Sequence, residues 1–497
     1  MLIVFILLIV LFGFLLYKLK FFNRPYISSG YQNVVIWMIT FLFIVFLAIK
    51  PSILYSKYVG GAEDLYSKYL VNSIINKKAE ISLEPSEELK NLENPYNPEE
   101  RENVEYYFDA SYYNGKYYIY FGIVPAILVF VPYTLITGQY LPISIGTFIF
   151  FIIAIIASAI LAIQIYKRWF KNLPFNLLIL FIVSLWISGL YIWNTWRIWA
   201  YELTLISGFA FVLLGLICIL LATKNKNNIN MKYLVLSCLC MALSVGCRPT
   251  FLLSSFLLIP FLYDIIKTSY KNKKLKYVIP AIVIPYIIVA IPLMFYNYIR
   301  YDSIFEFGAK YQLTAVDVTN LSDRYKDIPK GLYEYLLEPP KFKTEYPYIE
   351  LRVNPSGHTY NYYNGVMVCG ILFLNLSLIS CIFMPKYIRK VKDITLRNLM
   401  ISLPIVGLIS CILVVYMGGN AQRYAVDFFW MFSIISMILW FLMYQYSTKE
   451  VNKKAIIIIL IVLFIISICI NFCGTFLNSE SDYLKLYFPK IYEFFRF

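Results

Sequence analysis

The sequence predicts an all-α polytopic membrane protein with about 12 transmembrane helices. Of its 497 residues, 60% are hydrophobic and only 15% are charged, and the mean hydropathy is +0.66. Soluble chains carry roughly 45–50% apolar and about 25% charged residues, so a soluble fold could not bury this much apolar surface. Several stretches also approach the ~20 apolar residues that a helix needs to cross the hydrocarbon core.

Twelve apolar stretches are expected to cross the bilayer. They cover approximately residues 1–17, 33–52, 142–166, 174–193, 203–222, 233–247, 250–266, 277–296, 363–384, 399–417, 424–445 and 455–474. The first stretch has no positively charged segment before it and no small-residue cleavage site. We therefore expect a retained helix with its N-terminus outside, rather than a signal peptide.

The basic residues between these stretches predict the orientation. They form six clusters: Lys18, Lys20 and Arg24; Lys167, Arg168 and Lys171; Lys224, Lys226 and Lys232; Lys267, Lys271, Lys273, Lys274 and Lys276; Lys386, Arg389, Lys390, Lys392 and Arg397; Lys449, Lys453 and Lys454. All six lie on one side if twelve stretches cross and 119–137 does not. By the positive-inside rule this side is the cytoplasm, which places the protein in the plasma membrane. The net charge of +15 then reflects cytoplasmic loops and no nucleic-acid partner.

The apolar segment 119–137 is expected to stay at the outer interface as a half-buried or re-entrant segment. If it crossed, every later basic cluster would move to the outside. Its Gly122, Pro125 and Pro132 are tolerable where protein covers the backbone. The tyrosines just before it suit the headgroup zone, which favours an aromatic ring with a polar tip.

These boundaries divide the chain into six parts. They are N-terminal transmembrane helices (1–52), a first extracytoplasmic loop with interfacial helices (53–141), a central bundle (142–296), a second extracytoplasmic loop (297–362), a C-terminal bundle (363–474) and an extracytoplasmic tail (475–497). The nine cysteines all fall in or at the ends of apolar runs, so we interpret them as core residues and not as a metal site or a disulfide framework.

The unusual polar residues converge on the predicted outer face. Beside the expected spans lie Glu63, Asp64, Asp109, Arg197, Glu202, Arg248, Arg300, Glu306, Arg423 and Asp427. Ionisable residues near membrane depth are costly and are usually functional, so this arrangement predicts an outward-facing polar cavity. A carboxylate there can act as a general base, and an arginine can hold a phosphate and stabilise it as a leaving group.

Each of these residues also has a structural interpretation. Glu63 and Asp64 suit a helix N-terminus, and Asp109 suits a turn stabilised by its own side chain. Arg248 could place its charge at a hairpin tip, and Glu202 could pair with Arg197.

Five stretches stand out in order along the chain: "AEDLY", "DASYYNGKYYIYFGIVPAILVFVPY", "CRPT", "NYIRYDSIFEFGAKYQLT" and "QRYAVDF". They resemble the motifs of the GT-C class of polytopic membrane glycosyltransferases, which includes protein O-mannosyltransferases and aminoarabinose transferases. The likeness extends from about Tyr55 to Phe429. It implies a polyprenyl-phosphate sugar donor and an inverting transfer at the outer leaflet.

The resemblance also implies roles for individual residues. Asp64 or Glu63 matches the acidic motif of the family, and Asp109 is a second acidic candidate. The family motif is often Asp-Glu whereas this chain has Glu-Asp, so the identity of the base is open. Arg423, Arg248 and Arg300 are expected to bind the donor phosphate. The expected substrate-binding residues are Tyr112, Tyr113, Lys116, Tyr117, Glu202, Glu306 and Tyr424.

The expected function is thus transfer of a sugar from a polyprenyl-phosphate donor to a glycan, lipid or protein acceptor outside the cytoplasm. Two alternatives remain: a transporter or flippase for a lipid-linked saccharide, and a glycan polymerase or ligase that uses polyprenyl-diphosphate donors. Transporters often show internal repeats, and this chain shows none. Carboxylates are compatible with a divalent cation as cofactor, although the sequence contains no metal motif.

Overall fold

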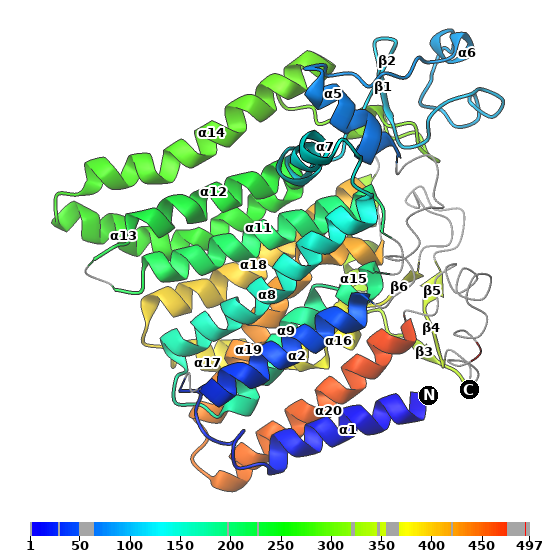
Figure 1. The fold of residues 1–497 in the computed structure, drawn as a ribbon. Coiled ribbons are helices and arrows are strands. Elements are labelled where there is room, and N and C mark those ends of the chain that lie inside the picture. Colours follow the sequence, from blue (N-terminus) through cyan, green and yellow to red (C-terminus); the bar gives the residue numbers. More distant parts are fainter. Residues whose placement is uncertain are drawn as a thin grey trace.

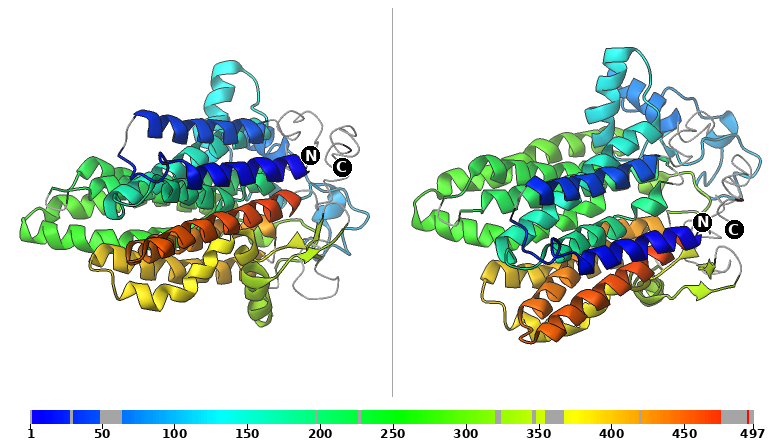
Figure 2. Two further views of the ribbon diagram at one scale, coloured as in Figure 1. Left: turned by 90° about the horizontal axis from the view of Figure 1, so that it is seen from below. Right: turned by 60° about the horizontal axis from the view of Figure 1, so that its bottom comes forward.

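Long helices lie side by side in this protein, with short strands and loops gathered at one end (Figure 1). The computed structural model describes residues 2–27, 30–48, 64–195, 198–225, 228–319, 324–344, 348–353, 367–418, 421–474 and 493. We call the end with the strands the strand end. The opposite end, which carries the six lysine- and arginine-rich clusters, is the basic end (Figures 1 and 2).

Every stretch expected to cross the membrane overlaps helical structure. The helices are α1 (Leu2–Lys18), α2 (Gly30–Ala48), α8 (Ile143–Trp169), α9 (Phe175–Ser188) with α10 (Tyr191–Asn194), α11 (Ala200–Ala222), α12 (Met231–Cys247), the 3-10 helix η3 (Pro249–Leu258) with α13 (Ile259–Lys271), α14 (Leu275–Tyr301), α16 (Ile371–Leu374) with η6 (Leu376–Phe383) and α17 (Met384–Ile388), α18 (Ile394–Gly418), α19 (Phe429–Gln445) and α20 (Glu450–Gly474).

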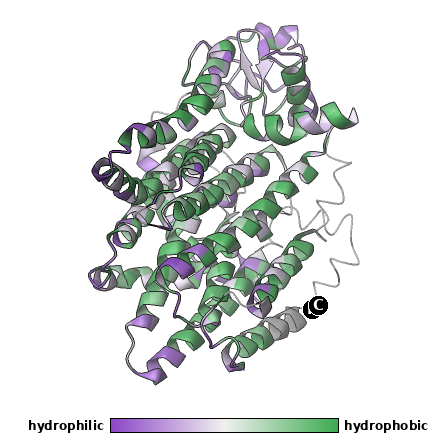
Figure 3. Ribbon diagram, turned by 60° about the vertical axis from the view of Figure 1, so that its left-hand side comes forward, coloured by the Kyte–Doolittle hydropathy of each residue, from purple (hydrophilic) through white to green (hydrophobic). Residues whose placement is uncertain are grey.

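Eight helical segments within the described residues are long and apolar enough to cross a membrane. They are α2, α8, α9 with α10, α11, η3 with α13, α14, α18 and α20. The prediction of an all-α polytopic membrane protein is therefore supported, and the count of twelve crossings stays a prediction. The helices are apolar along their lengths, and hydrophilic residues are concentrated in the connections (Figure 3).

The most central helices are α9, α11 and α19, which are buried on nearly all sides. The peripheral helix α14 instead exposes Ile288, Ile291 and Phe295 by more than half of their surface. Such a stripe would be unfavourable in water, whereas a bilayer accepts it at no cost. The outer surface of the bundle thus has the character of a lipid-facing surface.

Hydrogen bonds connect the clusters of the basic end. The α1–α2 loop joins the start of α9, where the Phe175 amide donates to the Arg24 carbonyl over 2.8 Å. The end of α8 joins the end of α11, since Arg168 donates to Thr223. The Tyr446 hydroxyl at the end of α19 donates to the Lys390 carbonyl over 2.7 Å. Arg168, Lys267 and Lys392 also line one cavity, so the described residues of the six clusters lie at one end of the bundle.

Part of the segment expected to stay at the interface forms a short helix that projects from the side of the bundle. It comprises the π-helical η2 (Ala126–Phe130) and α7 (Val131–Thr137), with five and seven residues. At 1.5 Å per residue it is about 18 Å long, which is less than the ~30 Å of a hydrocarbon core. Figures 1 and 2 show it transverse to the long helices. Its length and direction agree with the prediction that it does not cross.

The two long loops of the sequence meet at the strand end. The strands β1 (Ser111–Tyr113) and β2 (Lys116–Tyr118) form a hairpin, and Ser111 also pairs with Gln312 of the second loop. Two further antiparallel pairs follow: β3 (Lys341–Phe342) with β4 (Ile349–Glu350), and β5 (Arg352–Val353) with β6 (Met367–Val368). The remaining short elements are η1 (Leu65–Leu70), α5 (Val71–Ile75), α6 (Glu87–Lys90), η4 (Ala309–Tyr311), η5 (Arg324–Asp327), α15 (Ile328–Leu337) and η7 (Gln422–Asp427).

Candidate active site at the strand end

Asp109 is held in an unusual backbone conformation just before the β1–β2 hairpin. Its φ is +64°, in the left-handed region that aspartate tolerates better than most residues. The second loop fixes this conformation, because the Asp109 amide donates to the Leu313 carbonyl and the Leu313 amide donates to the Ala110 carbonyl, both over 2.9 Å. Such strained positions cluster at functional sites.

The carboxylate of Asp109 is buried at the start of α11. Its side chain is 1% exposed, and its Oδ2 accepts a hydrogen bond of 2.6 Å from the Tyr201 hydroxyl. Tyr201 lies in the first turn of α11, so the helix fixes the donor while the two loops fix the acceptor. A short hydrogen bond to a carboxylate is among the stronger ones in proteins.

Arg423 lies over the aromatic ring of Tyr201. Its guanidinium carbon is 4.6 Å from the centre of the Tyr201 ring, within the range of a cation–π contact. Its Nε is 3.9 Å from Oε1 of Glu202, whose Oε2 also accepts a hydrogen bond from the Trp199 amide at the start of α11. Glu202 therefore both caps α11 and faces Arg423. Arg197, the partner considered for Glu202 from the sequence, lies outside the described residues.

Arg248 completes a row of alternating cations and rings. It is the C-cap of α12, and its guanidinium carbon is 4.8 Å from the Tyr424 ring centre, while that of Arg423 is 5.1 Å from the same centre. Nε of Arg248 donates to Oδ2 of Asp427 over 3.1 Å, and the Thr250 hydroxyl donates to the same oxygen over 3.0 Å.

Burial and mutual attraction act on the pKa values of both members of the Arg248–Asp427 pair. Burial raises the pKa of the Asp427 carboxyl, although the attraction of Arg248 opposes this effect. Burial is the largest influence on Arg248 and lowers its pKa, and repulsion by Arg423 adds to this effect, but the attraction and the hydrogen bond of Asp427, with a contribution from Tyr424, together raise the pKa. Oδ1 of Asp427 is buried and accepts no hydrogen bond from any described residue.

We call Asp109, Tyr201, Glu202, Arg248, Arg423, Tyr424 and Asp427 the strand-end cluster. Its members come from the first loop, the start of α11, the end of α12 and the η7 segment between α18 and α19. The terminal nitrogens of Arg248 donate to no described residue, because only its Nε is engaged. An arginine with donors to spare beside a second arginine is suited to hold a phosphate.

The predicted interfacial segment packs directly against this cluster. A side chain at Gly122 would place its Cβ 1.9 Å from the Cys247 carbonyl oxygen, one residue before Arg248. The Tyr66 hydroxyl, just after Asp64 in the chain, donates to the Gly122 carbonyl over 2.7 Å. The neighbouring Phe121 ring meets the Tyr201 ring edge to face at 5.0 Å. The glycine thus allows the segment to approach the site.

The tyrosine-rich residues form the hairpin itself. Its turn is Asn114–Gly115, with φ values of +48° and +72°, as in the two-residue turns that favour this dipeptide. Tyr117 is buried, and burial raises its pKa to about 12, so its phenol stays protonated near neutral pH. Tyr112 is also mostly buried, whereas Tyr113 contacts Tyr311 and Asp302. Lys116 is exposed, 3.8 Å from Glu80.

Other predicted site residues lie outside the strand-end cluster. Arg300 is buried and donates to the Ile119 carbonyl and to Oδ1 of Asn297, both over 2.7 Å. Glu306 accepts from the Gly308 amide over 2.6 Å. Asp64 is exposed at the start of η1 and makes no capping hydrogen bond, and Glu63 lies outside the described residues. Arg300 and Glu306 thus have local structural partners.

Tyr201, a member of the cluster, and Thr250, which donates to its Asp427, lacked a clear signal in the sequence. Tyr201 links Asp109 to Arg423, but it is one of 45 tyrosines and nothing in its spacing distinguishes it. Thr250 follows Arg248 by two residues, and its proximity to Asp427 depends on how η3 and η7 pack beside α18. Among the described residues no group of three or more histidine, cysteine, aspartate or glutamate side chains is arranged to hold a metal ion.

The comparisons with known proteins give one structural likeness. No protein-family model and no curated protein sequence matches the chain. Its fold is similar to that of the oligosaccharyltransferase of Archaeoglobus fulgidus in the apo form, with a TM-score of 0.49 and 13% sequence identity. The likeness covers 95% of this chain and 60% of that chain, so this chain spans less than two thirds of the length of that enzyme.

Proposed function

We propose that this protein is a membrane glycosyltransferase that moves a sugar from a polyprenyl-phosphate donor to an acceptor hydroxyl at the strand end. The observation that carries the proposal is the strand-end cluster, where a buried carboxylate lies beside two arginines. A chain of contacts runs from Asp109 through Tyr201, Arg423, Tyr424 and Arg248 to Asp427. The resemblance of the sequence motifs to GT-C enzymes supports the same reaction.

In the proposed reaction Asp109 is the general base. The acceptor oxygen forms a bond to the anomeric carbon of the sugar, and the bond from this carbon to the phosphate oxygen breaks on the opposite face. The acceptor proton passes to the Asp109 carboxylate, and the polyprenyl phosphate leaves with the bonding electrons. A single displacement of this kind inverts the anomeric configuration.

The arginines stabilise the leaving group. Negative charge accumulates on the phosphate as its bond to the sugar breaks, and Arg248 and Arg423 are placed to receive it. Asp427 orients Arg248 through its Nε, which leaves the terminal nitrogens of the guanidinium for the phosphate. Glu202 limits the movement of Arg423 in a similar way. Two flanking carboxylates also reduce the repulsion between the guanidinium groups before the donor arrives.

The position of the site supports a lipid-linked donor. The cluster lies where the long helices end, and the short transverse helix α7 lies at the same end (Figure 1). A donor with a phosphate head and a polyprenyl tail would place its charge at this level and its tail in the bilayer. The basic clusters at the other end favour an outward orientation of the strand end by the positive-inside rule, and hence a plasma-membrane enzyme with an external site.

The two alternatives differ in their substrates. A flippase for lipid-linked saccharides would move the donor without breaking the bond between sugar and phosphate. A polymerase or ligase would keep the strand-end site but would require a polyprenyl diphosphate, whose additional charge calls for more cationic contacts. The strand-end cluster contains two arginines and three carboxylates, which favours the donor with a single phosphate.

The test is a transfer assay with purified protein and synthetic polyprenyl-phosphate sugars. Asp109→Asn removes the base and retains the shape of the side chain, so we expect product formation to fall by about 100-fold or more. Glu87→Gln is the control, because Glu87 is an exposed carboxylate of the first loop that pairs with Lys90 and lies outside the cluster; we expect it to retain most of the activity. Equal activity of Asp109→Asn and the unmodified protein would contradict the proposal, and release of sugar from the diphosphate donor alone would favour the ligase.

A further inference from the structure

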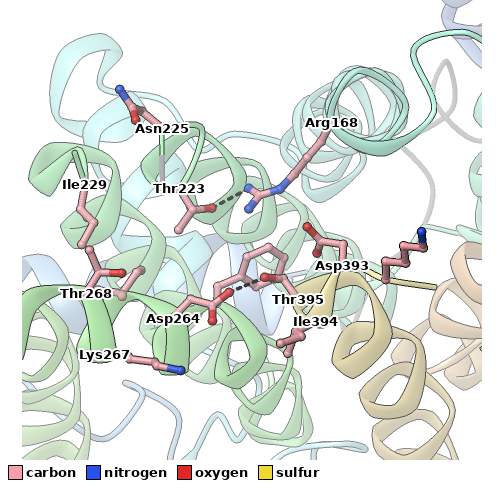
Figure 4. A pocket seen from close by; sticks show the side chains of 13 residues that line it. Arg168, Thr223, Asn225, Ile229, Asp264, Lys267, Thr268, Asp393, Ile394 and Thr395 are labelled. Carbon is pink, nitrogen blue, oxygen red and sulfur yellow. Dashed lines mark hydrogen bonds between the residues drawn. The ribbon is translucent and has the colours of Figure 1, made fainter. Parts of the chain in front are cut away.

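The basic end contains a cavity that the proposed reaction does not use. It has a volume of about 290 Å³ and lies between the ends of α8, α11 and α13 and the start of α18. Figure 4 shows side chains from these helices converging on it, with Arg168 directed inward from α8 and Asp264 from α13. The strand-end cluster lies at the opposite ends of the same helices, so the two sites are separate.

Arg168 is the central cation of this cavity. One of its terminal nitrogens donates to the Thr223 hydroxyl over 2.7 Å and to the Leu220 carbonyl over 3.4 Å. Its guanidinium carbon is 4.9 Å from the Trp169 ring centre and 5.5 Å from that of Phe261. It forms no ion pair with any described carboxylate. Thr223 and the two rings therefore fix the orientation of the guanidinium, while Asp393 and Asp264 attract its charge from beyond ion-pair distance.

The carboxylates of the cavity are occupied by other donors. Oδ2 of Asp264 accepts a hydrogen bond from the Thr395 hydroxyl, as Figure 4 shows. Oδ1 of Asp393 accepts from the Leu396 amide over 2.9 Å and so caps the start of α18. Lys267 and Lys392 add two cations at the cavity wall. With Arg168 the lining holds three cations and two carboxylates, an excess of one positive charge.

An apolar floor closes the cavity toward the membrane interior. The same helices line a narrow slot of about 20 Å³ one to two turns deeper, through residues such as Leu161, Leu216 and Leu399, and Phe261 borders both spaces. A charge bound against such a floor is less screened than in open water, so its attraction to Arg168 is strengthened.

We infer that this cavity is a phosphate-binding site in which Arg168 is the principal ligand. A guanidinium that is held in one orientation and has unused N–H donors can bind a phosphate bidentately. The excess of one positive charge in the cavity lining matches the single negative charge of a phosphate diester. The site lies at the membrane boundary of the basic end. The phosphate can therefore come from a phospholipid headgroup of that leaflet or from a soluble phosphate compound, and the experiment distinguishes the two.

The experiment measures binding of a fluorescent phosphatidylglycerol to the purified full-length protein in detergent. The competitors are unlabelled phosphatidylglycerol, inorganic phosphate and diacylglycerol, which has no phosphate. Arg168→Gln is expected to weaken the binding by about tenfold or more, because a charge-assisted contact is lost. Arg389→Gln is the matched control, since Arg389 is an exposed arginine of the same end outside the cavity.

The outcomes separate the sources of the phosphate. Competition by phosphatidylglycerol alone identifies a lipid headgroup, and equally strong competition by inorganic phosphate identifies a soluble ligand. Competition by diacylglycerol, or unchanged binding in Arg168→Gln, would overturn the inference. If Arg168→Gln does not fold, Thr268→Phe fills the cavity and leaves Arg168 in place. This variant must also weaken binding, and unchanged binding would again overturn the inference.

Discussion

At the scale of single residues, Tyr201 contacts two members of the cluster at once. Its hydroxyl donates to Asp109 and its ring lies under Arg423. Tyr201→Phe removes the first contact and keeps the second. We expect turnover to fall by about tenfold, and the acid limb of the pH–rate profile to move to higher pH, because a donated hydrogen bond stabilises the charged carboxylate.

The control for Tyr201→Phe is Tyr140→Phe, whose hydroxyl donates to Asn72 at the same end but outside the cluster. Its pH–rate profile should match that of the unmodified protein. If Tyr201→Phe lowered turnover without moving the acid limb, Tyr201 would be a packing residue and Asp109 would not be the titrating base.

The Arg248–Asp427 pair provides a test that separates stability from catalysis. Arg248→Gln leaves Asp427, 2% exposed, without its cation, and we expect a loss of about 2–3 kcal/mol in the free energy of unfolding. In Arg248→Gln/Asp427→Asn both charges are gone, so stability should return to within about 1 kcal/mol of the original. Transfer should stay low in both variants because the phosphate contact is lost.

The measurement for this pair is thermal unfolding in detergent beside the transfer assay. Recovery of activity together with stability in the double variant would show that Arg248 serves only to neutralise Asp427. In that case Arg248 would not bind the donor phosphate.

At the scale of elements, Gly122 decides whether the segment before α7 can reach the cluster. Gly122→Ala would bring its Cβ into the Cys247 carbonyl, and backbone at that distance cannot move aside locally. We expect a loss of about 2–3 kcal/mol in stability and a larger relative loss of activity. Gly30→Ala is the control, because nothing lies within 4 Å of a Cβ there. Equal unfolding temperatures for the two variants would contradict the close approach.

The sequence predicted the elements better than their contacts. Hydropathy located every stretch that forms a long helix, and the basic clusters indicated that 119–137 differs from them. The β-hairpin at Asn114–Gly115 was not predicted. An Asn-Gly dipeptide between alternating residues is a hairpin signal, but only a turn stabilised by the Asp109 side chain was expected. Arg300 shows a different limit, because one of its donors ends on the carbonyl of Ile119, which the sequence does not place beside it.

The candidate site, too, could be predicted only in part from the sequence. Span counting gives the end of the bundle at which a residue lies, so the gathering of Asp109, Arg248 and Arg423 at one end could be anticipated. Span counting does not give the lateral order of the helices. The choice of Arg423 as neighbour of Glu202, and of Tyr201 as donor to Asp109, follows from packing of α11 against η7 and the loops.

At the scale of the whole molecule, the central claim is that the two ends of the bundle face different compartments. The strand end carries the proposed transfer site, and the basic end carries the six clusters and the cavity around Arg168. The long helices between them separate the two sites by the length of the bundle (Figure 1). The donor chemistry proposed for the cluster requires the strand end to lie outside the cytoplasm.

The measurement that tests this claim most directly is thiol labelling of intact cells with a membrane-impermeant maleimide. One variant carries Lys116→Cys in the hairpin and the other Lys171→Cys in the α8–α9 loop, both at exposed positions, in a background without the nine native cysteines. We predict labelling of the Lys116→Cys protein in intact cells, and of the Lys171→Cys protein only after the membrane is opened. The reverse pattern would place the cluster in the cytoplasm and contradict transfer at the outer leaflet.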